Sequence, residues 1–151
     1  MTQNPPAQSP PADLEARLEA LGRELGAREA PHRDELARAR AVAEKLRNRV
    51  AEGLDRFQRA AAGAGAPQLH ASVSETRVDD KHLRAVQFDL ERGRYRAIVT
   101  VKARGEVTLV GPFHAGKAEG PCRSFPIGSS AEIEAALVGF LERFLEEAAT
   151  P

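Results

Sequence analysis

The sequence contains one match to the opening of a phosphate-binding loop, G-x-x-x-x-G-K, at residues 111–117. In such a loop, backbone N–H groups surround the phosphates, the lysine neutralises their charge, and a following Ser or Thr binds magnesium. Here position 118 is alanine, and Pro112 removes one N–H donor. Gly120-Pro121 stands where the required helix should begin. We therefore interpret the stretch as a wide connection between two strands and expect no nucleotide site.

His114 and Cys122 have the residue types of a general base and a thiol nucleophile. Thiol catalysis needs a lowered thiol pKa and a third group that orients the base, and the sequence marks neither. We therefore interpret Cys122 as a small apolar residue of the core.

Four further residues could supply metal ligands: His70, Asp79, Asp80 and His82. Their spacing is not that of a zinc or calcium motif, and Asp79-Asp80-Lys81 is typical of a turn. We expect no metal and no cofactor. Because no acid, base and nucleophile set can be assembled, we also expect no enzymatic activity.

Basic residues cluster in two places. The polar side of a predicted sheet carries Arg94, Arg96, Lys102 and Arg104. They could bind an acidic peptide or an anionic ligand, or they could form a solvated face that opposes aggregation.

The segment 31–62 holds eight basic residues against five acidic ones, a local net charge of +3. The basic residues are Arg33, Arg38, Arg40, Lys45, Arg47, Arg49, Arg56 and Arg59. Such a surface could contact nucleic-acid phosphates. Because aromatic residues are not interleaved and acids occur at 44, 52 and 55, we favour a solvated face or interhelical ion pairs.

The composition is that of an ordinary soluble protein. Apolar residues make up 42% of the 151 residues, and 22 basic residues balance 22 acidic ones, so no global charge favours nucleic acid or membrane. No segment approaches the roughly 18–20 apolar residues of a membrane span. The single cysteine favours a reducing compartment, and residues 1–11 do not read as a secretory signal. We expect a cytoplasmic, bacterial protein.

Hydrophobic periodicity divides the chain into four parts. Residues 1–12 predict a disordered Pro-rich tail, and residues 13–62 a helical arm with helices at about 13–27 and 31–62, the second beginning at Pro31. Residues 63–67 predict an Ala/Gly linker. Residues 68–151 predict an antiparallel sheet over 69–126, followed by a helix that Ser129 and Glu132 begin as a capping box.

The predicted fold class is therefore α+β. An N-terminal helical hairpin or coiled-coil arm precedes an antiparallel β-meander of four to five strands, which the C-terminal helix closes. We expect strands near 69–75, 86–90, 95–101, 107–109 and 123–125, with one apolar face.

An apolar stripe along the arm predicts self-association. A helix over 31–62 measures about 45 Å, whereas the remaining globule has a diameter of about 30 Å, so part of the stripe needs another partner. A homodimer through a helical bundle satisfies this. The predicted interface residues are Leu14, Leu18, Leu21, Leu25, Leu46, Val50, Leu54 and Phe57. The alternative is that the second helix covers the sheet, with Ile98 and Val110 as contacts.

We therefore expect a noncatalytic protein-interaction and oligomerisation module, whose sheet domain presents a binding surface. Two alternatives stay open. One is a small-molecule binder with an apolar cavity between Phe88, Val99, Leu109 and Phe140. The other is nucleic-acid binding through the Arg-rich second helix.

Overall fold

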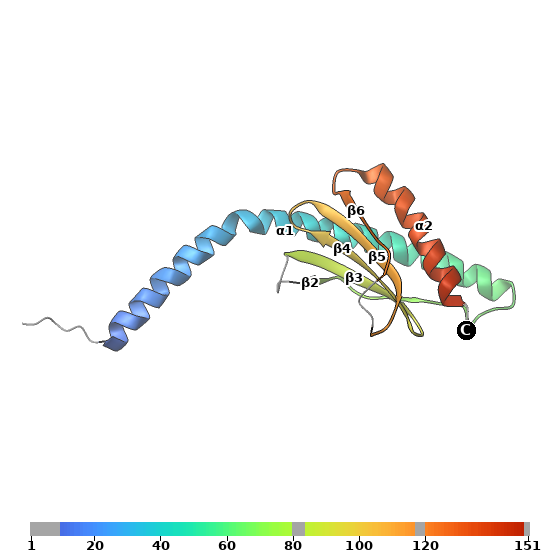
Figure 1. Ribbon diagram of the computed structural model, residues 1–151, viewed down its shortest axis with the longest axis horizontal. Coiled ribbons are helices and arrows are strands. Elements are labelled where there is room, and N and C mark those ends of the chain that lie inside the picture. The colour runs from blue at the N-terminus through green and yellow to red at the C-terminus, as the bar shows by residue number, and fades with distance from the viewer. Residues whose placement is uncertain (1–9, 80–83, 117–119, 150–151) are drawn as a thin grey trace, which may run out of the picture. The chain divides into compact units, whose positions relative to one another are not determined.

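A computed structural model describes residues 10–79, 84–116 and 120–149, with side chains from residue 13 onward (Figure 1). It divides into two units, Met1–Asp34 and Glu35–Pro151. The elements are α1 (Pro10–Gly63), β1 (Ser72–Val73), β2 (Arg77–Asp79), β3 (Ala85–Arg92), β4 (Tyr95–Lys102), β5 (Glu106–His114), β6 (Cys122–Pro126) and α2 (Ser130–Ala149). The predicted α+β class, with an antiparallel sheet and a C-terminal helix, is confirmed.

α1 is one continuous helix of 54 residues with Pro31 inside it, so the predicted break between two helices is wrong. Gly26, near the predicted end of the first helix, does not adopt the positive φ of a left-handed cap. Arg28, Glu29 and Ala30 after it are good helix formers. Pro31 therefore removes one backbone hydrogen bond without stopping the helix. In the described part of the chain, neither helix is long and apolar enough to cross a lipid bilayer.

The C-terminus of α1 is capped by the segment that the sequence suggested was a flexible linker. The N–H of Ala66 donates to the carbonyl oxygen of Ala61 (2.8 Å), and the N–H of Gly65 donates to that of Ala62 (3.0 Å). Gly65 has φ +95°, the left-handed conformation that this Schellman motif requires. The chain leaves α1 in a defined direction as a result.

The sheet is antiparallel throughout, in the order β1-β3-β4-β5-β6, with β2 also paired to β3. The predicted first strand, 69–75, corresponds to the short β1, and β2 at Arg77–Asp79 was not predicted. Ser74 stands where they separate, and it keeps its pairing with Asp89 through its own side chain. The N–H of Ser74 donates to the carbonyl oxygen of Asp89 (2.9 Å), and the N–H of Asp89 donates to Ser74 Oγ (2.9 Å).

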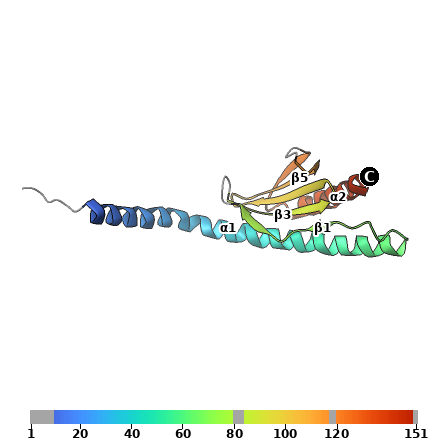
Figure 2. The same cartoon turned by 90° about the horizontal axis from the view of Figure 1, so that it is seen from below.

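One face of the sheet is apolar, and both helices of the larger unit cover it. Strand register places Phe88, Val99 and Leu109 side by side on this face. The core adds residues from the second half of α1 and from α2: Ala39, Ala43, Leu46, Val50, Leu54, Ile133, Leu137, Phe144 and Ala148. Figure 2 shows the strands lying above this part of α1. The opposite face carries the polar residues of each strand, such as Gln87, Thr100 and Ser124.

Arg92 joins three parts of the larger unit. Its Nη1 donates to the carbonyl oxygens of Gln68 (2.9 Å) and His70 (3.0 Å), and its Nε donates to that of Ala148 (3.1 Å). The last bond caps a carbonyl at the C-terminus of α2, where a cation is favoured by the helix dipole. Arg92 therefore ties β3, α2 and the segment leading into β1 together.

Arg92→Met tests this role, because it keeps a long apolar stem and removes all three donors. We expect the free energy of unfolding to fall by about 2 kcal/mol, the range for hydrogen bonds made by a charged group. The matched control is Arg94→Met, two residues away on an exposed turn, where we expect a change within about 0.5 kcal/mol. Urea unfolding followed by circular dichroism measures both, and equal effects would contradict the role.

Candidate interaction surfaces

The predicted interface along α1 separates into a buried and an exposed half. Leu46, Val50 and Leu54 are exposed by only 7%, 0% and 2%, and they belong to the core of their own chain. Phe57 is half-buried. The prediction that Leu46, Val50 and Leu54 face a second copy is therefore wrong, because the apolar face of the sheet already covers them. The alternative, that this segment covers the sheet, describes the structure better, although it packs on the apolar face and not on that of Ile98 and Val110.

The other half of the predicted interface is exposed. Leu14 and Leu18 are each exposed by 57%, and Leu21 and Leu25 each by 45%. These four residues, at spacings of 4, 3 and 4, are called the leucine stripe below. Ion pairs within the helix flank them, from Arg17 to Asp13 (3.7 Å) and from Arg28 to Glu24 (2.7 Å).

The four basic residues predicted for the sheet do not form one surface. Arg94 lies in the turn between β3 and β4, and Arg96 beside it is bound to Glu91 (3.2 Å). Lys102 and Arg104 lie at the opposite end of β4, about 20 Å away from Arg96 at 3.3 Å per residue. The predicted anion or partner surface is thus two separate pairs.

Lys102 and Arg104 share one carboxylate, that of Glu106. Lys102 Nζ lies 3.0 Å and Arg104 Nη2 lies 3.3 Å from Glu106 Oε1. The hydrogen bond from Lys102, then that from Arg104, lowers the pKa of Glu106 below its usual value. Together these three side chains carry a net charge of +1, and both cations are bound to Glu106.

Three of the α1 cations that suggested a nucleic-acid surface also bind within the chain. Arg49 forms an ion pair with Glu134 of α2, and Arg59 forms one with Asp55 (3.1 Å). The hydrogen bond and charge of Glu134 raise the pKa of Arg49. These contacts favour the predicted alternative of interhelical and intrahelical ion pairs over phosphate binding.

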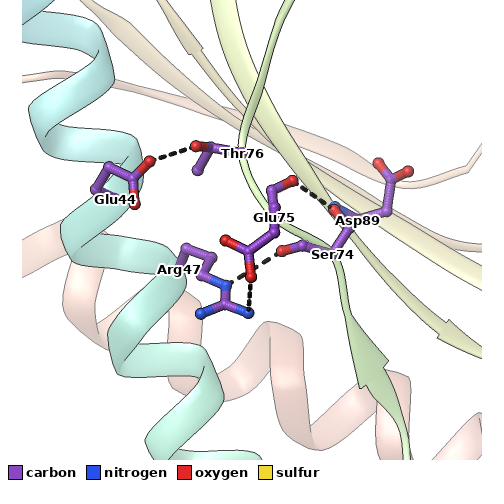
Figure 3. A network of polar contacts seen from close by, with 6 residues as sticks. All are labelled: Glu44, Arg47, Ser74, Glu75, Thr76 and Asp89. Atoms are coloured by element: carbon purple, nitrogen blue, oxygen red, sulfur yellow. Dashed lines mark hydrogen bonds and ion pairs between the residues drawn. The ribbon is translucent and has the colours of Figure 1, made fainter.

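The third of these cations, Arg47, belongs to a polar network between α1 and the junction of β1 and β2 (Figure 3). Its Nε donates to the carbonyl oxygen of Ser74 (3.2 Å), and its Nη2 lies 3.1 Å from the carboxylate of Glu75. The Thr76 hydroxyl donates to Glu44 one turn earlier on α1. The network holds residues 74–76 against α1, so the charge of Arg47 is used within the chain.

The described residues of the loop motif and of the thiol pair lie in or beside β5 and β6. Residues 111–114 lie in β5, and the N–H of Gly111 already donates to the carbonyl oxygen of Pro121 (2.8 Å), so it cannot face a phosphate. Lys117 and Ala118 lie outside the described residues.

His114 packs edge-to-face against Tyr95 (4.9 Å between centroids). It lies about 13 Å along β5 from Val110, the strand neighbour of Cys122.

Cys122 itself is exposed, which corrects its expected place in the core. Among the described strands, β6 is an edge strand with one unpaired side, so membership of a strand does not bury Cys122. Among the metal candidates, Asp80 and His82 lie outside the described residues. Within the residues that are described, no three His, Cys, Asp or Glu side chains come together as metal ligands.

A groove of about 230 Å³ lies between the β5–β6 edge and α2. Its lining is Leu109, Gly111, Pro121, Arg123, Ala135, Ala136, Gly139, Phe140 and Arg143. Leu109 and Phe140 were predicted to enclose an apolar cavity, but Phe88 and Val99 are fully buried in the core and do not line the groove. The groove is smaller than the roughly 300–1,000 Å³ of typical small-molecule pockets, which disfavours the small-molecule alternative.

Sequence reasoning missed this groove and the role of Arg123. The sequence indicates them only through spacing. Arg123 and Phe125 are two residues apart on a strand, so their side chains lie on the same face of the sheet, and Phe125 is a core residue. Arg123 lies 5.0 Å from the Phe125 ring centroid, a cation–π contact.

Glu106 provides a pH-dependent test of the Lys102–Arg104 pair. Its folded-state pKa lies below the unfolded value, so its stabilising contribution is present above the unfolded pKa and is lost as pH falls through the folded pKa. We expect Lys102→Gln with Arg104→Gln to raise the Glu106 pKa toward its usual value. Titration of the Glu106 carboxyl carbon by NMR measures this. The control, Arg94→Gln, should leave the titration unchanged, and an unshifted Glu106 in the double variant would contradict the assignment.

Comparison with known proteins assigns no family to this fold. The chain matches no protein-family model, no curated protein and no solved structure.

Proposed function

We propose that this protein is a noncatalytic interaction module that self-associates through the leucine stripe. The observation that carries the proposal is the exposure of four leucines, by 45–57%, on one face of the N-terminal part of α1. Leucine side chains are seldom kept in water as a contiguous stripe unless another surface covers them. A reducing, cytoplasmic setting fits the exposed, unpaired thiol of Cys122.

The spacing of the leucine stripe matches a short heptad pattern. Leu14 and Leu21 occupy d positions, and Leu18 and Leu25 occupy a positions. The a and d residues of one helix pack between those of a second helix, which makes another copy of this chain the simplest partner.

The charges beside the stripe favour antiparallel pairing. In that arrangement Leu14 packs with Leu25 of the second copy, and Leu18 packs with Leu21 of the second copy. Arg17 and Glu24 occupy g positions, and g positions of the two helices face each other in an antiparallel pair. Arg17 of each copy then faces Glu24 of the second copy, which gives two attractive pairs in the dimer. In a parallel pair, Glu24 would instead face Glu29 of the second copy, which is repulsive.

The expected association is weak and depends on concentration. Each leucine is already about half covered by its own helix, so pairing gains roughly half of the 1.5–3 kcal/mol for a full leucine burial. The loss of translational and rotational freedom opposes this by about 4–15 kcal/mol. Solution measurements must therefore span a wide range of concentration.

Leu18→Gln with Leu21→Gln tests the stripe, because it removes the two central apolar layers and keeps good helix formers. We expect the wild type to show a mass that rises toward that of a dimer with concentration, and the variant to stay a monomer. The matched control, Ala16→Gln with Ala20→Gln, changes exposed positions outside the stripe and should associate like the wild type. Light scattering measures all three. A wild type that stays monomeric at millimolar concentration would contradict the proposal.

A charge exchange tests the orientation. In antiparallel pairing, Arg17→Glu alone and Glu24→Arg alone each place like charges together, and we expect about tenfold weaker self-association for each. An equimolar mixture of the two variants restores both attractive pairs, so it should associate like the wild type. Sedimentation velocity measures the three samples. Stronger self-association of Glu24→Arg alone would indicate parallel pairing, since the introduced guanidinium would then face Glu29 of the second copy.

A further inference from the structure

We infer that the outer edge of β6, together with the groove beside it, binds a short extended peptide segment that carries a carboxylate two residues away from an apolar side chain. This site is separate from the leucine stripe. It combines backbone groups that no described strand pairs with, an arginine and an apolar recess within the larger unit.

The register of β6 determines which of its backbone groups are open. The N–H of Gly111 donates to Pro121, and the N–H of Ile127 donates to Gly105 (2.8 Å), so these residues form hydrogen-bonded pairs at the two ends of the β5–β6 ladder. Hydrogen-bonded and non-bonded pairs alternate in an antiparallel ladder. Cys122 and Ser124 therefore direct their N–H and C=O groups away from β5, toward the open edge.

The open part of the edge is short. Pro121 and Pro126 bound it, and neither has an N–H to donate. Their carbonyl oxygens already accept from Gly111 (2.8 Å) and Ser129 (3.0 Å). Two residues of an added strand can pair fully here, which suits a short peptide better than another sheet.

Arg123 supplies the charge. It lies between Cys122 and Ser124 and is directed to the groove side of the sheet, next to Leu109. In the described part of the chain Arg123 forms no ion pair. Its guanidinium contacts the Phe125 ring there. A peptide residue opposite Arg123 is on the same side of the added strand, so a carboxylate at that position reaches the guanidinium.

The groove accepts the apolar side chain. Residues two apart on a strand lie on the same face, so the peptide residue opposite Pro121 enters the recess formed with Phe140 and Gly139. A Cβ added at Gly139 meets no atom within 4 Å, so the absence of a side chain there leaves part of the recess open.

A second copy of β6 fits this edge less well than a peptide does. Two β6 strands that used both open residues of each chain would pair Cys122 with Ser124 of the second copy. That register places Arg123 directly opposite Arg123 of the second copy, where like charges repel. A carboxylate-bearing peptide replaces this repulsion with an ion pair.

The probes are two fluorescein-labelled, terminally blocked peptides, Thr-Glu-Thr-Leu-Thr and Thr-Leu-Thr-Glu-Thr, which present both strand directions. Fluorescence polarisation with the full chain measures binding. We expect one of them to bind, and its affinity to fall about tenfold in Arg123→Gln and when Gln replaces the Glu of the peptide. Arg94→Gln, an equal charge change on an exposed turn, should leave binding unchanged.

Two further variants separate the edge from the groove. Ser124→Pro removes an outward N–H and should abolish binding, whereas Ser124→Ala, which likewise loses the hydroxyl contact with Thr108, should retain it. Gly139→Leu fills the recess and should weaken binding at least tenfold without lowering the melting temperature, since leucine favours a helix.

The Leu18→Gln, Leu21→Gln variant should still bind the peptide, which distinguishes this site from the leucine stripe. The inference is overturned if neither peptide binds at millimolar concentration, or if binding survives both Arg123→Gln and Gly139→Leu. It is also overturned if Arg123→Gln promotes a dimer that excludes the peptide, because the edge then serves a second copy.

Discussion

The burial of a single apolar sheet face under two helices is the constraint on which the other features depend. The buried apolar residues of the second half of α1 and of α2 belong to one core with Phe88, Val99 and Leu109. The opposite face is left to polar side chains such as Thr100 and Ser124. β6 is the last strand of the sheet, and nothing in the described chain pairs with its outer edge. The leucine stripe, likewise, takes no part in the core.

The sequence predicted β3, β4 and the C-terminal helix well, and it predicted the short strands and the continuity of α1 poorly. Strict alternation located β3 and β4, because each has one buried face over eight residues. β5 was predicted only over 107–109 and extends from Glu106 to His114, where consecutive residues are buried and alternation is lost. β1 and β2 have two and three residues, too few for a period, and their separation depends on the contact of Ser74 with Asp89. Pro31 misled for a different reason. Proline is preferred in the first turn of a helix, but this preference does not require a helix to begin there. The residues before Pro31 are strong helix formers, and α1 continues through Pro31.

The candidate surfaces show why periodicity alone cannot identify an interface. Leu18 and Leu46 follow the same helical spacing, yet one is 57% exposed and the other 7%. The difference arises from the sheet that packs on the second, and no local pattern encodes it. The basic residues behave in the same way. Arg49 reads as a surface cation, but its partner Glu134 is 85 positions away in sequence. Only tertiary structure could show that its charge is already bound.

The two proposed surfaces differ in what gives them specificity. Leucine side chains attract any apolar surface, so orientation in the stripe must come from its flanking charges, Arg17 and Glu24. The β6 edge has the opposite character, since backbone groups fix the register and a side chain selects the sequence. An open edge ordinarily invites uncontrolled strand addition. Pro121 and Pro126 limit strand addition to the short stretch around Arg123. Because so few residues can pair there, the side chain of Arg123 has a large share in selecting the added strand. Protection against aggregation and recognition of a short peptide thus follow from one arrangement of residues.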